Sequence, residues 1–362
     1  MTDAKPPTKV LVVDDSPFNR RFIAEGFAGV PDVQVVARAA DGQEALDLTF
    51  LHRPDVITLD LEMPRMDGFT FLRILMARLP TPVIIVSSYS QRENVFKALE
   101  LGAVDFVTKP DFTQLQDAPE VRDSLVQKVL ALRSRASDSA IAPGAASSPA
   151  VSARMTAAAP ASGPIAVSDD YVAPKKLVVI GASTGGPSAL LNLFSVLTTA
   201  SRAAFAIAQH MPDKFTRTFS ERLDKRGPIR VREAQGGETL AMHQALVCPG
   251  KRNLELVREG GVLRSVVKMA DNDDRYVPSV DRLFKSAAKF AGSELVAVVL
   301  TGMGDDGLEG AKAVKDAGGI VIIESQESAV VFGMPGAVFR AGLADHVLPI
   351  RQIGPFIVSE TR

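Results

Sequence analysis

The chain has 362 residues, of which 46% are hydrophobic and 23% are charged. At roughly 150 residues per domain, this length predicts two domains with enough apolar residues for ordinary buried cores. The net charge of -1 argues against a broad electrostatic surface for nucleic acid or anionic lipid. The single cysteine, Cys248, excludes a disulfide framework and fits a reducing compartment.

The N-terminal segment MTDAKPPTK lacks the apolar stretch and cleavage pattern of a signal peptide. The longest apolar runs, such as LVVIGA and LVAVVLTG, are too short to span a bilayer. We therefore expect a cytoplasmic protein with no membrane insertion.

Residues 8–135 alternate short apolar runs with amphipathic segments. The runs are continuous rather than alternating, which is typical of parallel strands buried on both faces. They read KVLVV, VQVVA, DVITLD, PVIIVSS and DFVT, and helical patterns such as GQEALDLTFL separate them. This repetition predicts a first domain (1–135) that is a doubly wound α/β sheet of about five parallel strands.

Residues 136–173 are rich in Ala, Ser, Pro and Gly, as in SDSAIAPGAASSPAVSARMTAAAP. Apolar residues larger than alanine are too sparse there to offset the entropy cost of ordering, so we predict a flexible linker.

Residues 174–362 resume the alternation with KKLVVIG, AAFAIAQH, LVAVVLTG and GIVIIES as buried strands. The segments GPSALLNLFSVL and GLEGAKAVKDAGG follow two of them as helices. The segment RNLELVREGGVLRSVVK alternates around a Gly-Gly centre and predicts an antiparallel hairpin. The second domain is therefore expected to be a larger doubly wound α/β sheet that carries this hairpin.

Three carboxylates fall at strand ends in the first domain: Asp14 and Asp15 after KVLVV, and Asp60 after the third strand. Ligands of open parallel sheets gather outside the carboxyl ends of the strands. Converging acids favour a hard cation such as Mg²⁺, beside which one carboxylate could accept a phosphoryl group. Lys109 and Ser87 end two further strands and are expected in the same pocket. Simple helix capping by each acid would not explain the whole set.

The segments VVDDS, TLDLEMPRMDG, VSS and FVTKP resemble the response-regulator receiver family over residues 8–135. The resemblance implies a flavodoxin-like fold and a set of site roles. It assigns Asp60 as the phosphoacceptor, Asp14, Asp15 and the carbonyl of Glu62 as further Mg²⁺ ligands, and Ser87, Phe106 and Lys109 as switch residues, Phe106 moving when Ser87 engages the phosphoryl group.

The second domain contains the motif G-x-S-x-G, with Ser183 between Gly181 and Gly185. In a nucleophile elbow the glycines allow a sharp turn from strand to helix, which exposes the serine. Backbone amides at the start of such a helix can hold a developing oxyanion. A glycine turn with Ser183 as a helix cap is the alternative interpretation.

A serine nucleophile needs a base, and the second domain has three histidines. His210 ends the strand that follows the Ser183 unit, so we expect it at the same edge of the sheet. His243 lies in an irregular stretch and His346 begins a late strand, so both are expected to be structural or solvated.

An acid should complete the set, and Asp305 and Asp306 both follow the strand LVAVVLTG. Spacing alone does not say which of them orients the imidazole. Residues 302–307 also fit G-x-G-x-x-G, with Glu324 after the next strand, as a dinucleotide site requires. Two aspartates at that helix start would repel a pyrophosphate, so nicotinamide binding is disfavoured.

Several long segments of residues 175–358 resemble the chemotaxis protein-glutamate methylesterase catalytic domain. They are IGASTGGPSAL, QHMPDKFTRTFSERLD, PSVDRLFKSAA, LTGMGDDGLEGAKA and VVFGMPGAV. The resemblance implies Ser183, His210 and Asp306 as a triad, with oxyanion donors at the backbone of Thr184 and Met303. It implies no cofactor in this domain.

With a receiver in front, the resemblance implies phosphorylation-activated hydrolysis of glutamate γ-methyl esters on chemoreceptor signalling helices. It also implies deamidation of receptor glutamines, and a chemotaxis histidine kinase as phosphodonor. A phosphorylation-gated binding module with an idle esterase site is the alternative of a different class. A DNA-binding regulator lacks support, because the second domain has no basic recognition-helix pattern.

Overall fold

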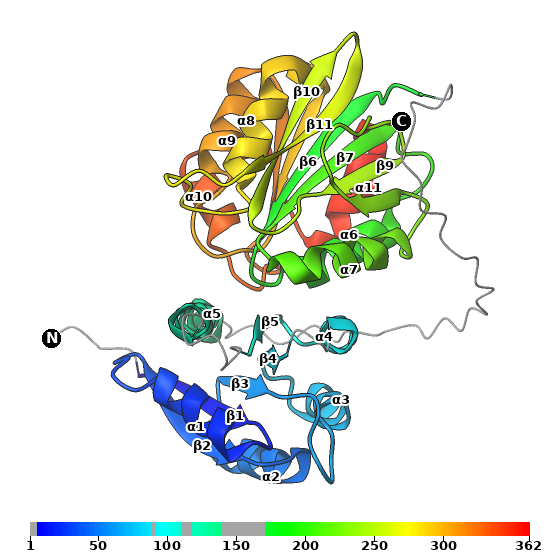
Figure 1. Cartoon of the computed structure of the whole chain (residues 1–362). Helices are drawn as coiled ribbons and strands as arrows, with labels where there is room; N and C mark the ends of the chain where they lie inside the picture. The colour runs from blue at the N-terminus through cyan, green and yellow to red at the C-terminus, as the bar shows by residue number, and fades with distance from the viewer. Residues whose placement is uncertain (1–5, 89–91, 110–117, 139–170) are drawn as a thin grey trace, which may run out of the picture.

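The computed structural model describes residues 6–88, 92–109, 118–138 and 171–362. The predicted linker, 136–173, lies largely outside these residues. The described residues form two α/β units stacked one on the other (Figure 1).

The first unit follows the predicted order of strands and helices. Its strands are β1 (Thr8–Val13), β2 (Val33–Ala39), β3 (Val56–Leu59), β4 (Val83–Ser87) and β5 (Asp105–Thr108). Its helices are α1 (Pro17–Gly26), α2 (Gly42–His52), α3 (Gly68–Arg78), α4 (Arg92–Glu100) and α5 (Ala118–Asp138). All strand pairs are parallel, in the order β2-β1-β3-β4-β5, which confirms the five-stranded parallel sheet.

Successive residues of a strand point to opposite faces of the sheet, and each face of this sheet has its own helices. Leu11 and Val13 of β1 pack in a cluster with side chains of α2, α3 and α4. Val10 and Val12 pack in a cluster with side chains of α1 and α5. This double coverage explains why the strands are continuously apolar.

The second unit contains a larger sheet and a hairpin. Its strands are β6 (Lys176–Ala182), β7 (Ala203–Gln209), β8 (Arg230–Glu233), β9 (Gln244–Val247), β10 (Arg252–Glu259), β11 (Val262–Met269), β12 (Leu295–Val299), β13 (Ile320–Glu324) and β14 (His346–Leu348). Its helices are α6 (Gly186–Val196), α7 (Asp213–Asp224), α8 (Val280–Ala291), the 3₁₀ turn Gly292–Glu294, α9 (Leu308–Asp316), α10 (Met334–Arg340) and α11 (Ile350–Glu360).

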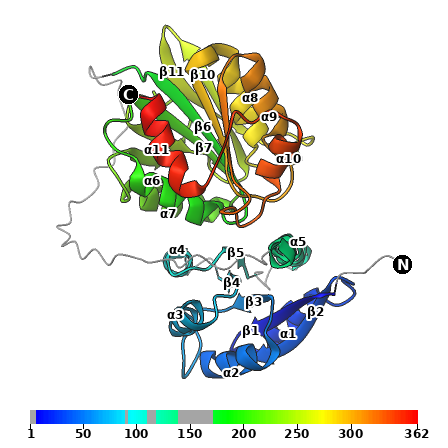
Figure 2. The ribbon, with the colours of Figure 1, turned by 180° about the vertical axis from the view of Figure 1, so that it is seen from behind.

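The large sheet has seven parallel strands in the order β14-β13-β12-β6-β7-β9-β8, and β10 and β11 form the predicted antiparallel hairpin. Helices α6, α7 and α11 cover one face, while α8, α9 and α10 lie on the other (Figure 2). The strand order reverses at β6, because the next strand along the chain, β7, pairs with one side of β6 and the later strand β12 pairs with its other side. Crevices at such a reversal of strand order are the usual ligand sites of open α/β sheets.

No helix in the described ranges combines the length and the apolar character that crossing a membrane requires.

Candidate functional site

Ser183 follows directly after β6, in the predicted strand–turn–helix arrangement. Gly185, the residue before α6, has φ of +79°, a left-handed conformation that side chains disfavour, so glycine is needed for the turn. The Ser183 amide donates to the Thr301 carbonyl after β12 at 3.0 Å. Ser183 is therefore held, half-buried, where β6 and β12 end beside the start of α6.

His210 follows directly after β7, the neighbour of β6. Ala182 and Gln209 are register partners, and the His210 amide donates to the Ala182 carbonyl at 3.0 Å. Ser183 and His210 thus follow paired residues at the ends of adjacent parallel strands. The sequence prediction that both lie at one edge of the sheet agrees with this pairing.

Asp306 is the aspartate that contacts His210. Its Oδ2 lies 2.8 Å from His210 Nε2, and the residue is 1% exposed. The carboxylate also accepts from the amides of Val280 (2.8 Å) and Asp281 (2.9 Å) at the start of α8. The N-terminus of a helix stabilises negative charge, so α8 helps to hold this buried carboxylate.

Asp281 makes the reciprocal contact with α9. Its Oδ1 accepts from the amides of Gly307 (2.9 Å) and Gly310 (2.6 Å). Burial is the main cause that raises the pKa of Asp281 above its usual value, and the charge of Asp306 raises it further. The two aspartates therefore cap each other's helices, which fixes the segment that carries Asp306.

The other candidates from the sequence, Asp305, His243 and His346, have different partners. Asp305 accepts from the Tyr276 hydroxyl at 2.9 Å and pairs with Arg275. His243 Nε2 lies 3.1 Å from the Thr199 carbonyl, and the His346 ring packs on Phe356.

Gln209 is a site residue that sequence reasoning missed. Its Nε2 donates to the carbonyls of Ser183 (2.9 Å) and His210 (3.0 Å), and the residue is 1% exposed. A polar residue that ends an otherwise apolar buried strand was the available signal, because buried amides need partners.

The amides of Thr184 and Met303 were predicted as oxyanion donors. Neither donates to an acceptor within the described ranges. Thr184 follows Ser183 at the elbow, and Met303 follows Gly302, whose amide and carbonyl bond to Val331 and Gly333. Their role as oxyanion donors stays a prediction.

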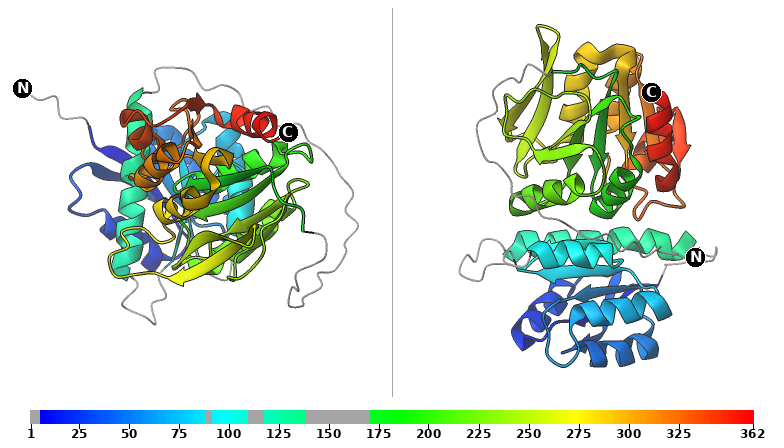
Figure 3. Two further views of the ribbon diagram at one scale, coloured as in Figure 1. Left: turned by 90° about the horizontal axis from the view of Figure 1, so that it is seen from above. Right: turned by 90° about the vertical axis from the view of Figure 1, so that its right-hand side faces the viewer.

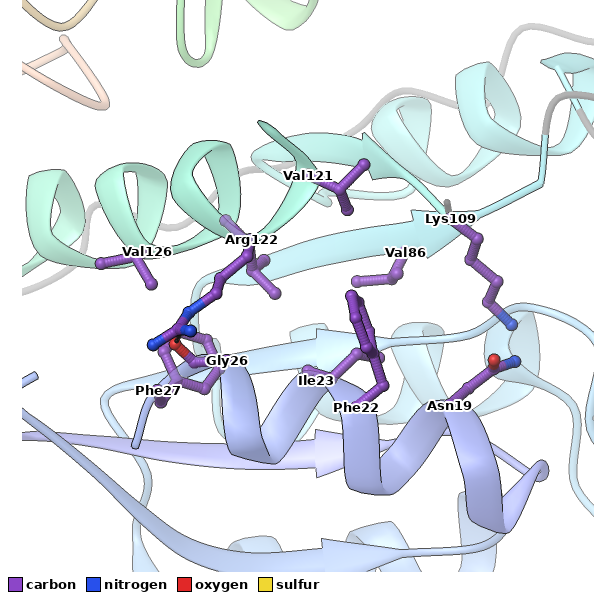
Figure 4. A pocket seen from close by; sticks show the side chains of 11 residues that line it. Asn19, Phe22, Ile23, Gly26, Phe27, Val86, Lys109, Val121, Arg122 and Val126 are labelled. Carbon is purple, nitrogen blue, oxygen red and sulfur yellow. Dashed lines mark hydrogen bonds between the residues drawn. The ribbon is translucent and has the colours of Figure 1, made fainter. Parts of the chain in front are cut away.

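Asp14, Asp15 and Asp60 converge in the first unit as predicted, with one carboxylate oxygen of each within 4.8 Å of the others. Lys109 Nζ lies 2.6 Å from Asp60 Oδ2 and 2.9 Å from Asp14 Oδ2. Burial raises the pKa of Asp60 above its usual value, and Lys109 opposes that effect. Figure 4 shows the Lys109 side chain extending from the end of β5 toward Asn19 of α1.

The same view shows a small apolar cavity between α1 and α5, lined by residues that include Phe22, Val86 and Leu125. Its volume of about 20 Å³ is too small for an organic ligand.

The predicted switch residues lie beside this pocket. Ser87 is buried at the end of β4, and its carbonyl accepts from the Lys109 amide at 2.8 Å. Phe106 is 4% exposed, and its ring centroid lies 4.6 Å from that of Phe215 in α7. Phe106 therefore contacts the helix that begins three residues after His210.

Further contacts join α4 to α7, which face each other in Figures 1 and 3. The Phe96 ring stacks on Phe219 with centroids 5.7 Å apart. Arg222 pairs with Glu93 at 2.6 Å and with Glu100 at 3.0 Å. An aromatic contact flanked by ion pairs thus connects the two units.

A second contact lies at the candidate active site itself. Val331, in the loop before α10, belongs to a buried apolar cluster whose other buried members are all in the first unit. Met303 and Val330 pack against that cluster. The first unit therefore lies against the loop that carries one of the predicted oxyanion donors.

Comparison with known proteins agrees with this arrangement. A family model described as CheB methylesterase matches residues 178–357, and one described as response regulator receiver domain matches residues 10–120. The chain is 43% identical to protein-glutamate methylesterase/protein-glutamine glutaminase 1 of Myxococcus xanthus, over 98% of this chain and 97% of that protein. The chain belongs to the protein-glutamate methylesterase family.

Other members of this methylesterase family extend the match. Protein-glutamate methylesterase/protein-glutamine glutaminase 3 of Geobacter sulfurreducens is 40% identical over 97% of this chain and 96% of its own length. The crystal structure of the Thermotoga maritima CheB methylesterase catalytic domain matches with a TM-score of 0.50 and 39% identity. It covers 51% of this chain and 98% of that structure, which confirms the fold of the second unit.

Proposed function

We propose that the second unit hydrolyses glutamate γ-methyl esters on chemoreceptor signalling helices through Ser183, His210 and Asp306. The observation that carries this proposal is the 2.8 Å contact of His210 with buried Asp306, at the end of the strand beside Ser183. A base oriented by an acid next to a serine at a strand–helix turn is the arrangement of a serine hydrolase.

In the proposed reaction, His210 takes the hydroxyl proton of Ser183 as its oxygen attacks the ester carbonyl. Because Nε2 is engaged by Asp306, the proton goes to Nδ1. The amides of Thr184 and Met303 stabilise the oxyanion. The protonated imidazole returns the proton to the departing methoxide, and methanol leaves a glutamyl ester on Ser183. Water, deprotonated by His210, then releases the glutamate and restores the serine.

The same route applied to a glutamine side chain releases ammonia instead of methanol. The curated relatives carry both activities in their names, so we propose that this chain also deamidates receptor glutamines.

We propose Asp60 as the phosphoacceptor of the first unit, with a chemotaxis histidine kinase as donor. The donor set of Asp14, Asp15 and Asp60 is all oxygen, which fits Mg²⁺, and the carbonyl of Glu62 would add a ligand. The ion would supply positive charge that lets acidic side chains and phosphoryl oxygens share the pocket. Lys109 already neutralises part of this charge at Asp60 and Asp14.

We propose that the unphosphorylated first unit inhibits the second by packing on its active-site loops. Support comes from the contacts of Met303 and Val330 with the first unit and from the ring contact of Phe106 with Phe215. A phosphoryl group on Asp60 would engage Ser87 and Lys109, and the resulting movement of Phe106 would weaken the contact with α7.

The test is methanol release from methylated receptor membranes, measured with and without a small-molecule phosphodonor and Mg²⁺. We expect wild-type release to rise with the phosphodonor, Ser183→Ala to release none, and Asp60→Asn to keep only the unstimulated rate. Release by Ser183→Ala at the wild-type rate would contradict the assigned nucleophile. No release by phosphorylated wild type would favour a binding module with an idle site.

A further inference from the structure

We propose that Tyr276 is a positioning residue for His210, held in place by Asp305. The inference rests on the proposed esterase function and adds one residue to its active site. Its starting point is a pair of parallel rings: the imidazole of His210 and the phenol of Tyr276 have centroids 5.3 Å apart and planes inclined by 8°.

The stack supplies a constraint that Asp306 alone does not. Asp306 holds one edge of the imidazole through Nε2, and a single hydrogen bond leaves the ring free to rotate about that direction. A flat face beside the ring opposes this rotation. Tyr276 therefore keeps the imidazole of His210 in one orientation at the end of β7, the strand beside β6, which Ser183 follows.

Tyr276 is itself fixed from its other end. Its hydroxyl donates to Asp305 Oδ1 at 2.9 Å, and Arg275 pairs with the same carboxylate at 3.1 Å. Burial, and then the hydrogen bond and charge of Asp305, raise the pKa of the phenol above its usual value. The hydroxyl consequently stays a donor, and Asp305 of the G-M-G-D-D-G turn gains a function.

The turn that carries Met303 is shaped around this hydroxyl. Gly304 has φ of +86°, and a Cβ at that position would lie 2.5 Å from the Tyr276 oxygen. Tyr276 thus contacts the base on one side and the turn with a proposed oxyanion donor on the other. One side chain fixes the relative position of two parts of the site.

The stack also favours the transition state. His210 becomes positively charged when it takes the serine proton, and the face of an aromatic ring attracts a cation. Asp306 lies at the edge of the imidazole and Tyr276 on its face, while Arg275 lies over the same phenol ring, 5.0 Å from its centroid. Losing the aromatic face should lower kcat about ten-fold and leave KM nearly unchanged, because the interaction strengthens only after proton transfer.

The experiment compares full-length Tyr276→Leu, Tyr276→Phe, Asp305→Ala and Asp305→Asn with wild type, each activated by the phosphodonor. Initial rates of methanol release give kcat and KM, and the rate at which a fluorophosphonate labels Ser183 reports the activated serine without the receptor. Thermal unfolding midpoints check that each variant is folded.

We expect Tyr276→Leu to lose about ten-fold in kcat and in labelling rate, and Tyr276→Phe, which keeps the ring, to stay within about three-fold of wild type. Asp305→Asn, which keeps an acceptor oxygen, should have a kcat and labelling rate similar to those of Tyr276→Phe. Asp305→Ala should have values between those of Tyr276→Phe and Tyr276→Leu. A folded Tyr276→Leu with wild-type kcat, a loss confined to KM, or equal damage from Phe and Leu would overturn the inference.

Failure of this inference is distinguishable from failure of the proposed function. If Ser183→Ala is inactive while the Tyr276 variants behave as wild type, only the positioning role is wrong. If Ser183→Ala releases methanol as wild type does, the proposed chemistry itself is wrong.

Discussion

His210 presents Nε2, and not Nδ1, to Asp306, at 2.8 Å. Chymotrypsin-like proteases use the opposite orientation, in which the acid holds Nδ1 and the serine proton goes to Nε2. Ser183 and His210 come from adjacent parallel strands, and Asp306 comes from the turn before α9, where its carboxylate accepts from the first amides of α8.

Asp306→Asn should lower turnover about ten-thousand-fold, because an amide no longer selects the imidazole tautomer that can accept the serine proton. It should also destabilise the protein by about 1 kcal/mol, since the carboxylate accepts two amides of α8. Methanol release and thermal unfolding measure the two effects. Asp305→Asn is the matched control at the neighbouring position, and equal losses in both variants would argue against Asp306 as the orienting acid.

Gln209→Met should lower kcat about ten- to a hundred-fold, because it removes the donors that hold the Ser183 and His210 carbonyls. The Ser183 carbonyl would keep the Gly186 amide as a donor, whereas the His210 carbonyl would lose the Gln209 amide, at a cost in unfolding free energy of about 1–3 kcal/mol. Steady-state kinetics and chemical denaturation give both numbers. Gln244→Met, at the start of β9, is the control for loss of an amide side chain away from the site. A fully active Gln209→Met would show that catalysis does not need the hydrogen bonds of Gln209 to the Ser183 and His210 carbonyls.

Arg222→Glu should raise the unstimulated esterase rate, because it replaces two ion pairs with Glu93 and Glu100 by repulsion across the contact of the two units. Exposed pairs contribute about 0.2–1 kcal/mol each, so we expect an increase of about three- to ten-fold. High salt should reduce the difference from wild type.

Glu93→Arg in the Arg222→Glu background restores one pair of opposite charges and should return the rate toward wild type. An unchanged or lower rate in a folded Arg222→Glu protein would count against inhibition by the first unit.

Cys248 should resist thiol reagents in the folded protein. Burial raises the pKa of its thiol to about 12, so at pH 8 only about one thiol in ten thousand is the reactive thiolate. Labelling with a chromogenic disulfide should therefore be slow in buffer and complete within minutes in denaturant. Rapid native labelling at pH 8 would show that the sheet opens readily near the end of β9, which Cys248 follows.

Periodicity and strand-end placement predicted most of the fold and much of the site. Continuous apolar runs identified the strands of the first unit and β6, β7, β12 and β13 of the second, but not the short strands β8 and β9. Parallel order requires the residues that follow neighbouring strands to share an edge, as Ser183 and His210 do. The same reasoning placed Asp14, Asp15 and Asp60 together.

Contacts between residues far apart in sequence were not predictable in this way. Spacing left Asp305 and Asp306 equivalent, and only the packing of α8 against α9 directs Asp306 toward His210. Tyr276 comes from the segment before α8, which carries no periodic signal, so its stack on His210 depends wholly on tertiary structure. The ring contact of Phe106 with Phe215 depends likewise on how the two units pack.

That ring contact also acts in the opposite direction. If phosphorylation of Asp60 weakens the packing of Phe106 on Phe215, then by thermodynamic reciprocity the packed esterase disfavours the phosphorylated form by the same free energy. The esterase unit would then be an effector of its own regulator, biasing the phosphorylation equilibrium whenever it is docked. A receptor that holds the two units apart would, by this linkage, favour the phosphorylated state without touching the phosphorylation pocket.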